Sequence, residues 1–328
     1  MKHLWKIVAS NYAVSKYDIT KNRYSILLLV FYVKIVRFDM EEDIRLFLNH
    51  LAKEKNCSKN TLDAYHNDLS QLAACITSLE GTEGRNTPQS DFTEEHLKSY
   101  MLKIREKKYA ISTIARKTAA ARAFLKYLSE KGKVKKDLVP KLSAPRVSKQ
   151  RPMALSESEV QRLLAEAARL PTYDSKRDRA MLELLYATGL LASELMALNV
   201  DDINSEEGSV TVNSQKGKMR KVPLDKRISL LIAEYIEIVR MKLLTNDKEK
   251  ALFLNQRGKR LTRQGFWQIV QGYSDSAGLN TKVTPRTLRH SYAIHRLNKG
   301  ADLQSIQEVL GHAHISTTRA YKQVQGIH

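Results

Sequence analysis

The sequence predicts a mainly α-helical protein of two domains: an N-terminal four-helix bundle, and an α-rich second domain with one small antiparallel β-sheet. Apolar residues recur every three or four positions across residues 39–130, which is the spacing of amphipathic helices. A basic, proline-containing stretch, residues 131–152, separates this region from the rest. Helical spacing returns in residues 153–328, interrupted by two short alternating segments. A chain of 328 residues can bury a core of ordinary size in each of two domains.

The first 38 residues do not fit this plan. Their one long apolar run, Ile26–Val33, is far shorter than the roughly 20 residues that a membrane span needs. It also lies too far from the start, and lacks a small-residue cleavage site, for a signal peptide. Because Met40 opens a well-patterned helix, we expect residues 1–38 to lie outside the working fold. The short apolar run predicts no membrane association. The two cysteines, Cys57 and Cys75, have no disulfide or metal spacing, so we expect a reduced, cytoplasmic protein.

The charge balance favours a polyanionic partner. The net charge is +20 and the pI is near 9.8. Residues 1–38 contain seven Lys or Arg and one Asp, so the remainder keeps +14 without them. Nucleic acid is the first candidate partner, although a merely basic surface would give the same balance.

Four helices are expected in the first domain. One covers Ile44–Leu51, a second follows Ser58 as N-cap, a third follows Thr93, and a fourth begins at Ser112. Four helices in about ninety residues predict a bundle. The fourth helix carries a basic face suited either to DNA backbone phosphates or to simple solvation, made of Arg116, Lys117, Arg122 and Lys126.

Residues 131–152 are expected to form a linker between the domains. Lysine, arginine and proline dominate this stretch, and apolar periodicity is weak. Residues before proline adopt extended backbone, so the linker is predicted to cross the outside of the protein as a strap.

The second domain begins with a capping box, Ser156 with Glu159, ahead of a helix. A further helix ends at Gly189, and Ser193 is expected to cap a short one. Two strands, residues 208–213 and 219–224, flank a glycine-containing turn, and a third strand is expected near Phe253. Further helices are predicted at residues 227–243, 263–277, 286–299 and 302–310.

The last fifty residues carry a chemical pattern. Arg289 is followed 23 positions later by His312, and Tyr321 comes nine positions after that histidine. A phenol, with an ordinary pKa near 10, is a poor nucleophile unless its neighbours stabilise the developing charge. Arginines that hold the non-bridging oxygens of a phosphate supply that stabilisation. The order of cations, imidazole and phenol therefore favours attack on a phosphodiester.

Five ordered motifs resemble the tyrosine recombinases of the phage integrase family, most closely the Xer-type enzymes and related phage integrases. They are Ala187–Leu195, Lys216–Lys218, Thr284–His290, Leu310–His312 and Ser316–Tyr321. The resemblance implies a helical core-binding (SAM-like) domain and a catalytic domain with the DNA breaking-rejoining enzyme fold, which together clamp DNA. It also implies a reaction that needs no metal and no nucleotide cofactor.

Carried over by motif, the resemblance implies that Tyr321 is the nucleophile and forms a 3′-phosphotyrosyl bond. Arg289 matches the second catalytic arginine, and His312 matches the family's His/Trp position beside the phosphate. Lys216 matches the general acid that protonates the leaving 5′-oxygen, with Lys218 as the alternative. For each of these residues, an ordinary surface or packing role is the alternative interpretation.

His290 and Glu194 match positions that support the site, although both could be purely structural. Two departures from the family pattern stand out. Leu191 occupies the position of the first catalytic arginine, and Arg286 occupies that of the histidine in His-x-x-Arg. Leucine cannot donate a hydrogen bond, and losing one such donor typically costs about 10²–10³ in rate. Arg286 is expected to compensate only in part.

The preferred interpretation is a site-specific DNA recombinase that acts as a homo-tetramer, or as a hetero-tetramer with a related recombinase. Its role would be chromosome-dimer resolution or mobile-element integration and excision. The alternative is a cleavage-impaired DNA-binding pseudo-recombinase, which Leu191 favours. A basic helical regulator unrelated to recombination is weaker, because it leaves the spacing of Tyr321 unexplained.

Overall fold

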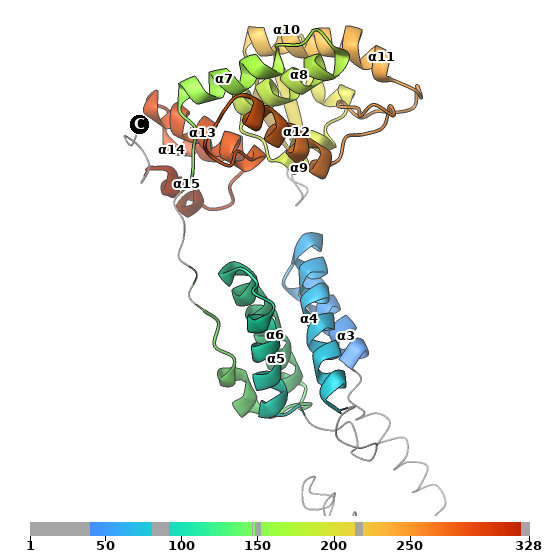
Figure 1. Ribbon diagram of the computed structural model, residues 1–328, viewed down its shortest axis with the longest axis vertical. Helices are drawn as coiled ribbons and strands as arrows, with labels where there is room; N and C mark the ends of the chain where they lie inside the picture. The colour runs from blue at the N-terminus through green and yellow to red at the C-terminus, as the bar shows by residue number, and fades with distance from the viewer. Residues whose placement is uncertain (1–39, 81–91, 146, 148–151, 214–218, 323–328) are drawn as a thin grey trace, which may run out of the picture. The chain divides into compact units, whose positions relative to one another are not determined.

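The computed structural model describes residues 40–80, 92–145, 147, 152–213 and 219–322 (Figure 1). Contacts within the chain divide it into two compact units, Met1–Ser148 and Lys149–His328. The segment predicted to lie outside the working fold, residues 1–38, falls outside the described residues.

The first unit is a helical bundle (Figure 1). Its core is built from aromatic and leucine side chains, among them Phe47, Leu69 and Phe124, which are at most 2% exposed. The expected start of the third helix is confirmed, because Thr93 accepts a hydrogen bond from the N–H of His96 in a capping box. The elements are α3 (Met40–Glu54), α4 (Lys59–Glu80), α5 (Glu94–Glu106), α6 (Ile111–Glu130) and the 3₁₀-helix η2 (Lys136–Lys141).

The prediction that residues 131–152 cross the outside as an extended strap is wrong for their first half. Lys136–Lys141 form the 3₁₀-helix η2, which contacts α5 and α6. Leu138 and Leu142 are 5% and 1% exposed and belong to the core of the bundle. The two leucines gain more by burial than the neighbouring lysines lose, because the lysine heads remain at the surface.

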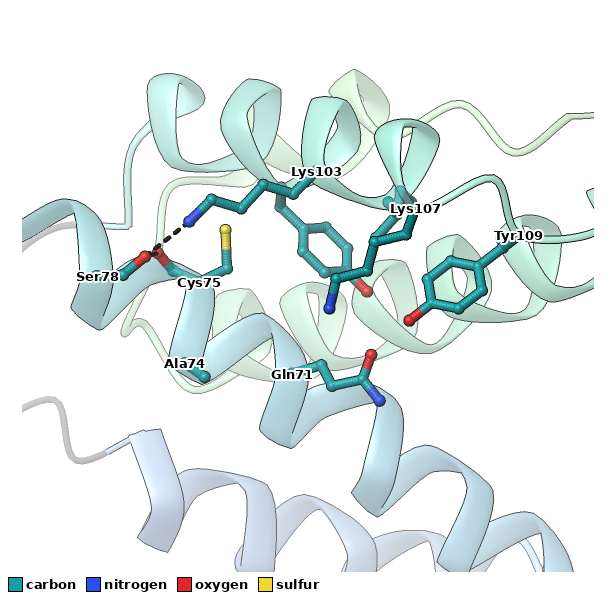
Figure 2. A pocket seen from close by; sticks show the side chains of 9 residues that line it. Gln71, Ala74, Cys75, Ser78, Lys103, Lys107 and Tyr109 are labelled. Atoms are coloured by element: carbon teal, nitrogen blue, oxygen red, sulfur yellow. Dashed lines mark hydrogen bonds between the residues drawn. The ribbon is translucent and has the colours of Figure 1, made fainter.

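An open pocket of about 220 Å³ lies in the first unit, lined by residues of α4 and α5 (Figure 2). The Lys103 ammonium donates a hydrogen bond of 2.7 Å to the hydroxyl of Ser78 across it. Lys107 and Tyr109 also line the pocket, which therefore combines apolar walls with lysine ammonium groups.

The second unit is also mainly helical. Helix α8 is its central element, because ten of its residues are buried and it contacts α7, α9, α10 and α13. The predicted capping box at Ser156 and the predicted helix end at Gly189 are both confirmed. The helices are α7 (Glu157–Ala167), α8 (Tyr173–Thr188), α9 (Ala192–Ala197), α10 (Lys226–Glu234), α11 (Met241–Leu243), α12 (Arg263–Ser276), α13 (Pro285–Asn298), α14 (Leu303–Leu310) and α15 (Ile315–Lys322), with a 3₁₀-helix η3 (Val200–Asp202) and a π-helix η4 (Tyr235–Arg240).

The small sheet is antiparallel with strand order β1-β2-β3. Strands β2 (Ser209–Asn213) and β3 (Met219–Pro223) form the predicted hairpin, with Val210 opposite Val222. The third strand, β1 (Ile203–Asn204), pairs with β2, so its expected place near Phe253 was wrong. Phe253 lies instead between isolated bridges at Ala251 and Leu254. The mainly helical fold class with one small antiparallel sheet is confirmed.

Three helices at the carboxyl end share a separate apolar cluster. Residues of α13, α14 and α15 pack together there, and Tyr321 of α15 is among them at 3% exposure. The packing of α15 against α13 and α14 brings the last predicted motif next to the two motifs before it.

Candidate active site

Arg289 is held rigidly inside the second unit. Its helix, α13, begins with a capping box at Thr284 and a proline in the first turn, so the backbone before Arg289 is well fixed. Its guanidinium donates 2.8 Å and 2.9 Å hydrogen bonds to the carbonyls of Gly189 and Leu310. These carbonyls stand at the carboxyl ends of α8 and α14, where the helix dipole favours a cation. Arg289 is 5% exposed.

Gly189 permits this arrangement. Its φ of 61° lies in the left-handed region, and an added Cβ would lie 2.4 Å from a ring carbon of Tyr292. The glycine therefore lets α8 end close against α13, with its carbonyl directed at Arg289.

Tyr321 lies between two imidazole rings. Its hydroxyl is 2.8 Å from Nδ1 of His290, and the two ring centroids are 5.4 Å apart. On the other side, the His312 ring stacks on it at a centroid distance of 6.3 Å. Burial raises the pKa of the Tyr321 phenol, while the positive charges of Arg289 and Arg286 act in the opposite direction.

Arg286 determines how His290 meets the phenol. The Arg286 Nε–H donates to Nε2 of His290 at 3.1 Å. Burial, together with nearby arginines, lowers the pKa of His290 to about 4, so the ring is neutral at pH 7. A neutral imidazole has one acceptor and one donor nitrogen. With Nε2 accepting, Nδ1 carries the proton and donates to the hydroxyl oxygen of Tyr321.

His312 follows the left-handed Gly311 that ends α14. Its Nδ1 is 2.9 Å from the Thr318 hydroxyl on α15. Burial, with Arg289 and other cations nearby, lowers the pKa of His312 to about 4. His312 is therefore a neutral ring that connects the turn after α14 to the helix of Tyr321.

Leu191 occupies the position at which the family motif has an arginine, so its side chain supplies no positive charge. It is the N-cap residue of α9, and its side chain is 43% exposed. The expectation that Ser193 caps this helix was wrong, since Ser193 lies inside it. The Leu191 N–H donates to Glu194 at 2.9 Å, so the carboxylate satisfies a free N–H of the helix start.

Glu194 is the anion of the site, at 5% exposure. Both its oxygens accept hydrogen bonds from Arg220, at 2.7 Å and 2.8 Å, and Arg289 is 3.9 Å away. Burial alone would raise the pKa of Glu194, but the bonds from Arg220 and the Leu191 N–H lower it overall. Sequence reasoning missed Arg220; the signal was a basic residue in a strand beside a motif whose own arginine is missing.

The structure thus brings together six predicted residues of the second unit: Tyr321, Arg289, His312, Arg286, His290 and Glu194. Lys216, the expected general acid, and its alternative Lys218 lie outside the described residues. The strands on either side of them, β2 and β3, are described, and Arg220 of β3 reaches Glu194.

The predicted basic face of α6 is divided. Arg116, Arg122 and Lys126 are exposed, and Arg116 forms an ion pair with Asp68. Lys117 differs from the prediction, because it is 3% exposed and donates to Asp68 at 3.0 Å. Its charge is neutralised inside the bundle, so Lys117 is a core residue rather than part of the basic face.

Within the described part of the chain, no group of three or more His, Cys, Asp or Glu side chains could hold a metal ion. None of the described helices has the length and apolar content required to traverse a lipid bilayer.

Comparisons with known proteins relate both units of the chain to one family. Residues 153–327 match the family described as "Phage integrase family", and residues 44–132 match "Phage integrase, N-terminal SAM-like domain". Tyrosine recombinase XerC of Roseiflexus castenholzii is 42% identical over 285 residues, covering 86% of this chain and 88% of that protein. Tyrosine recombinase XerD of Listeria monocytogenes is 37% identical over 287 residues, covering 87% and 95%.

Two solved structures show the same fold. XerH site-specific recombinase bound to palindromic difH substrate matches with a TM-score of 0.66 at 19% identity, covering 88% of this chain and 92% of that one. A lambda integrase (75–356) dimer bound to a COC′ core site matches with a TM-score of 0.65 at 18% identity, covering 88% and 96%.

A SAM-like helical domain followed by a catalytic integrase domain places the chain in the phage integrase family. Within that family, it is a tyrosine-type site-specific recombinase similar to XerC and XerD. The resemblance inferred from the five motifs is confirmed.

Proposed function

We propose that this recombinase cleaves and rejoins DNA through Tyr321, by way of a 3′-phosphotyrosyl intermediate. The observation that carries the proposal is the position of the phenol: its hydroxyl is 2.8 Å from His290, and its ring stacks on His312. Tyr321 of α15 makes these contacts with residues of the same chain, which supports the proposal that each subunit supplies its own nucleophile.

In the proposed reaction, the Tyr321 oxygen attacks the scissile phosphorus and the bond to the 5′-oxygen breaks. Arg289 holds the non-bridging oxygens, because its guanidinium is already fixed by two carbonyls and need not reorganise. The Tyr321 hydroxyl gives up its proton to solvent as its oxygen bonds to phosphorus, and His290 donates from Nδ1 to the phenolic oxygen and so stabilises the phenolate. Lys216 is the proposed proton donor to the 5′-oxygen, by its match to the family motif.

The 5′-hydroxyl of a second duplex then attacks the phosphorus, and the bond between phosphorus and the Tyr321 oxygen breaks. The hydroxyl proton returns to Lys216, and the Tyr321 oxygen takes a proton from solvent. Because one phosphodiester is exchanged for another through an ester of similar energy, no nucleotide is consumed. We propose a tetramer on two duplexes, with four copies of this chain or with a related recombinase, acting in the cytoplasm. The exposed Arg122 and Lys126, together with Arg116, are proposed to contact backbone phosphates from α6.

The test begins with a DNA site selected from random duplexes by binding to the Tyr321→Phe variant. A nick placed near the cleavage point lets a short fragment diffuse away and traps the covalent intermediate. The wild-type protein should give a DNA adduct that resists denaturant, and Tyr321→Phe should give none at equal DNA affinity. An adduct that persists in Tyr321→Phe would contradict the proposed nucleophile.

A second function is favoured by Leu191, whose exposed side chain offers no donor to a phosphate. A cleavage-impaired protein would occupy its sites without exchanging strands. Tight binding to the selected DNA with no adduct from the wild-type protein would establish that function. The location of the selected sequence, at a chromosomal resolution site or at the ends of a mobile element, separates the two host roles.

A further inference from the structure

Arg220 is a charged residue inside the site that the motifs do not assign. It lies on β3, and its side chain is 14% exposed. Its Nε donates to the carbonyl of Val309 at 2.7 Å, and its two terminal nitrogens donate to the two oxygens of Glu194. A planar guanidinium held at three nitrogens by two separate segments has a single orientation.

This guanidinium also borders the turn that carries His312. An added Cβ at Gly311 would lie 3.0 Å and 3.2 Å from Nη1 and Cζ of Arg220. Gly311 has a φ of 69°, so a glycine both adopts the turn and leaves room for the arginine. Arg220 therefore joins the sheet, the start of α9 and the end of α14 at one point beside the site.

Glu194 is where Arg220 and Arg289 meet. The carboxylate accepts 2.7 Å and 2.8 Å hydrogen bonds from Arg220, while the nearest approach of Arg289 is 3.9 Å. Among the ion pairs of the described residues, these are the two that Glu194 makes. A carboxylate that is 5% exposed requires a cation, and Leu191 cannot supply one.

We propose that Arg220 is a positioning residue of this active site. By neutralising Glu194, it keeps Arg289 from closing onto that carboxylate and leaves the Arg289 guanidinium available to the phosphate. Arg220 thus takes over, toward Glu194, the pairing that an arginine at position 191 could provide. The inference rests on the proposed function, because it names the group that keeps Arg289 ready to bind phosphate.

The first test measures single-turnover adduct formation on the nicked substrate. At saturating protein, Arg220→Ala should slow the rate at least tenfold, because Arg289 is then drawn toward the unpaired Glu194 carboxylate and away from the phosphate. Adding Glu194→Gln to Arg220→Ala should recover most of the lost rate, because the unpaired carboxylate is removed. A purely structural arginine would show the loss and the recovery in thermal stability, and not in the saturated rate of the folded protein.

Arg227→Ala is the matched control. Arg227 makes the same two-bond ion pair with a buried glutamate, Glu183, at 2.9 Å and 2.7 Å, but on α10 and α8. Its removal should leave the rate within threefold of the wild type. An unchanged rate in Arg220→Ala would overturn the proposal. If Arg220→Ala does not fold, the double variant Arg220→Ala with Glu194→Gln is measured instead, and a rate below a tenth of the wild type would overturn the proposal.

A second readout needs no cleavage. In the Tyr321→Phe background, binding is compared between duplexes with a charged phosphate and with a neutral methylphosphonate, scanned across the core of the selected site. Arg220→Ala should reduce the preference for the charged phosphate at least threefold, and Glu194→Gln should restore it. Loss of that preference without any wild-type adduct would refute the proposed reaction but keep this inference, whereas an unchanged preference refutes the inference itself.

Discussion

Replacing Leu191 by arginine should increase the rate of DNA cleavage. The side chain is 43% exposed at the N-cap of α9, so a longer residue fits without displacing the core. The backbone N–H of residue 191 keeps its bond to Glu194, so the helix start is preserved. The added guanidinium would stand beside the carboxylate that already pairs with Arg220 and lies 3.9 Å from Arg289.

The magnitude follows from what the site already contains. A single transition-state donor is worth about 10²–10³ in rate, and an arginine acting on a phosphoryl group can reach ~10³–10⁵. Here Arg289 is in place, Arg286 adds positive charge, and Glu194 is already neutralised by Arg220. We therefore expect a gain of at least about tenfold, which corresponds to ~1.4 kcal/mol of transition-state stabilisation.

The assay is single-turnover adduct formation at saturating protein, which separates the chemical step from DNA affinity. Leu170→Arg, which adds the same charge at another exposed leucine of the second unit, is the control for non-specific attraction. It should change affinity but not the saturated rate. An unchanged or lower rate in folded Leu191→Arg would refute the reasoning that the site lacks a phosphate donor at position 191.

Three further predictions concern stability. His290 and His312 have folded pKa values of about 4, below the ordinary 6.5, so folding favours their neutral forms. The stabilisation that these neutral rings contribute should be complete above pH 6.5 and should be lost as the pH falls toward 4. The melting temperature measured against pH should show this loss, and its pH dependence should be weaker when either histidine is replaced by asparagine. Gly189→Ala should destabilise by about 3 kcal/mol in urea, because its Cβ meets Tyr292 and its φ is positive. Lys117→Ala should cost about 3 kcal/mol by the same measurement, since it leaves a buried carboxylate with one partner fewer; a cost below 1 kcal/mol would place Lys117 at the surface.

Local signals in the sequence predicted the elements that depend on near neighbours. The capping box at Ser156, the glycine that ends α8 and the β2–β3 hairpin all follow from residues within a few positions of one another. The meeting of Arg289, His312 and Tyr321 was predicted through motif resemblance, since spacing alone does not fix how α13, α14 and α15 pack.

Contacts between distant segments were not predicted. Arg220 binds a carboxylate 26 positions away, and Lys117 binds one 49 positions away, so neither partner is visible in a local pattern. Leu138 lies in a stretch whose lysines and prolines suggested an exposed linker, but its burial against the bundle outweighed that composition. Arg286 was expected to place a positive charge near a phosphate. Its hydrogen bond to Nε2 of His290, which fixes the tautomer of that ring, could not be predicted from charge alone.

The most direct measurement is to identify the amino acid that becomes linked to DNA. The trapped adduct from the nicked substrate is digested with protease and nuclease, and the modified peptide is sequenced by mass spectrometry. A nucleotide 3′-phosphate on Tyr321 is the expected result. A nucleotide attached to any other residue, or a protein that saturates its selected site yet yields no modified peptide even as Leu191→Arg, would contradict the account.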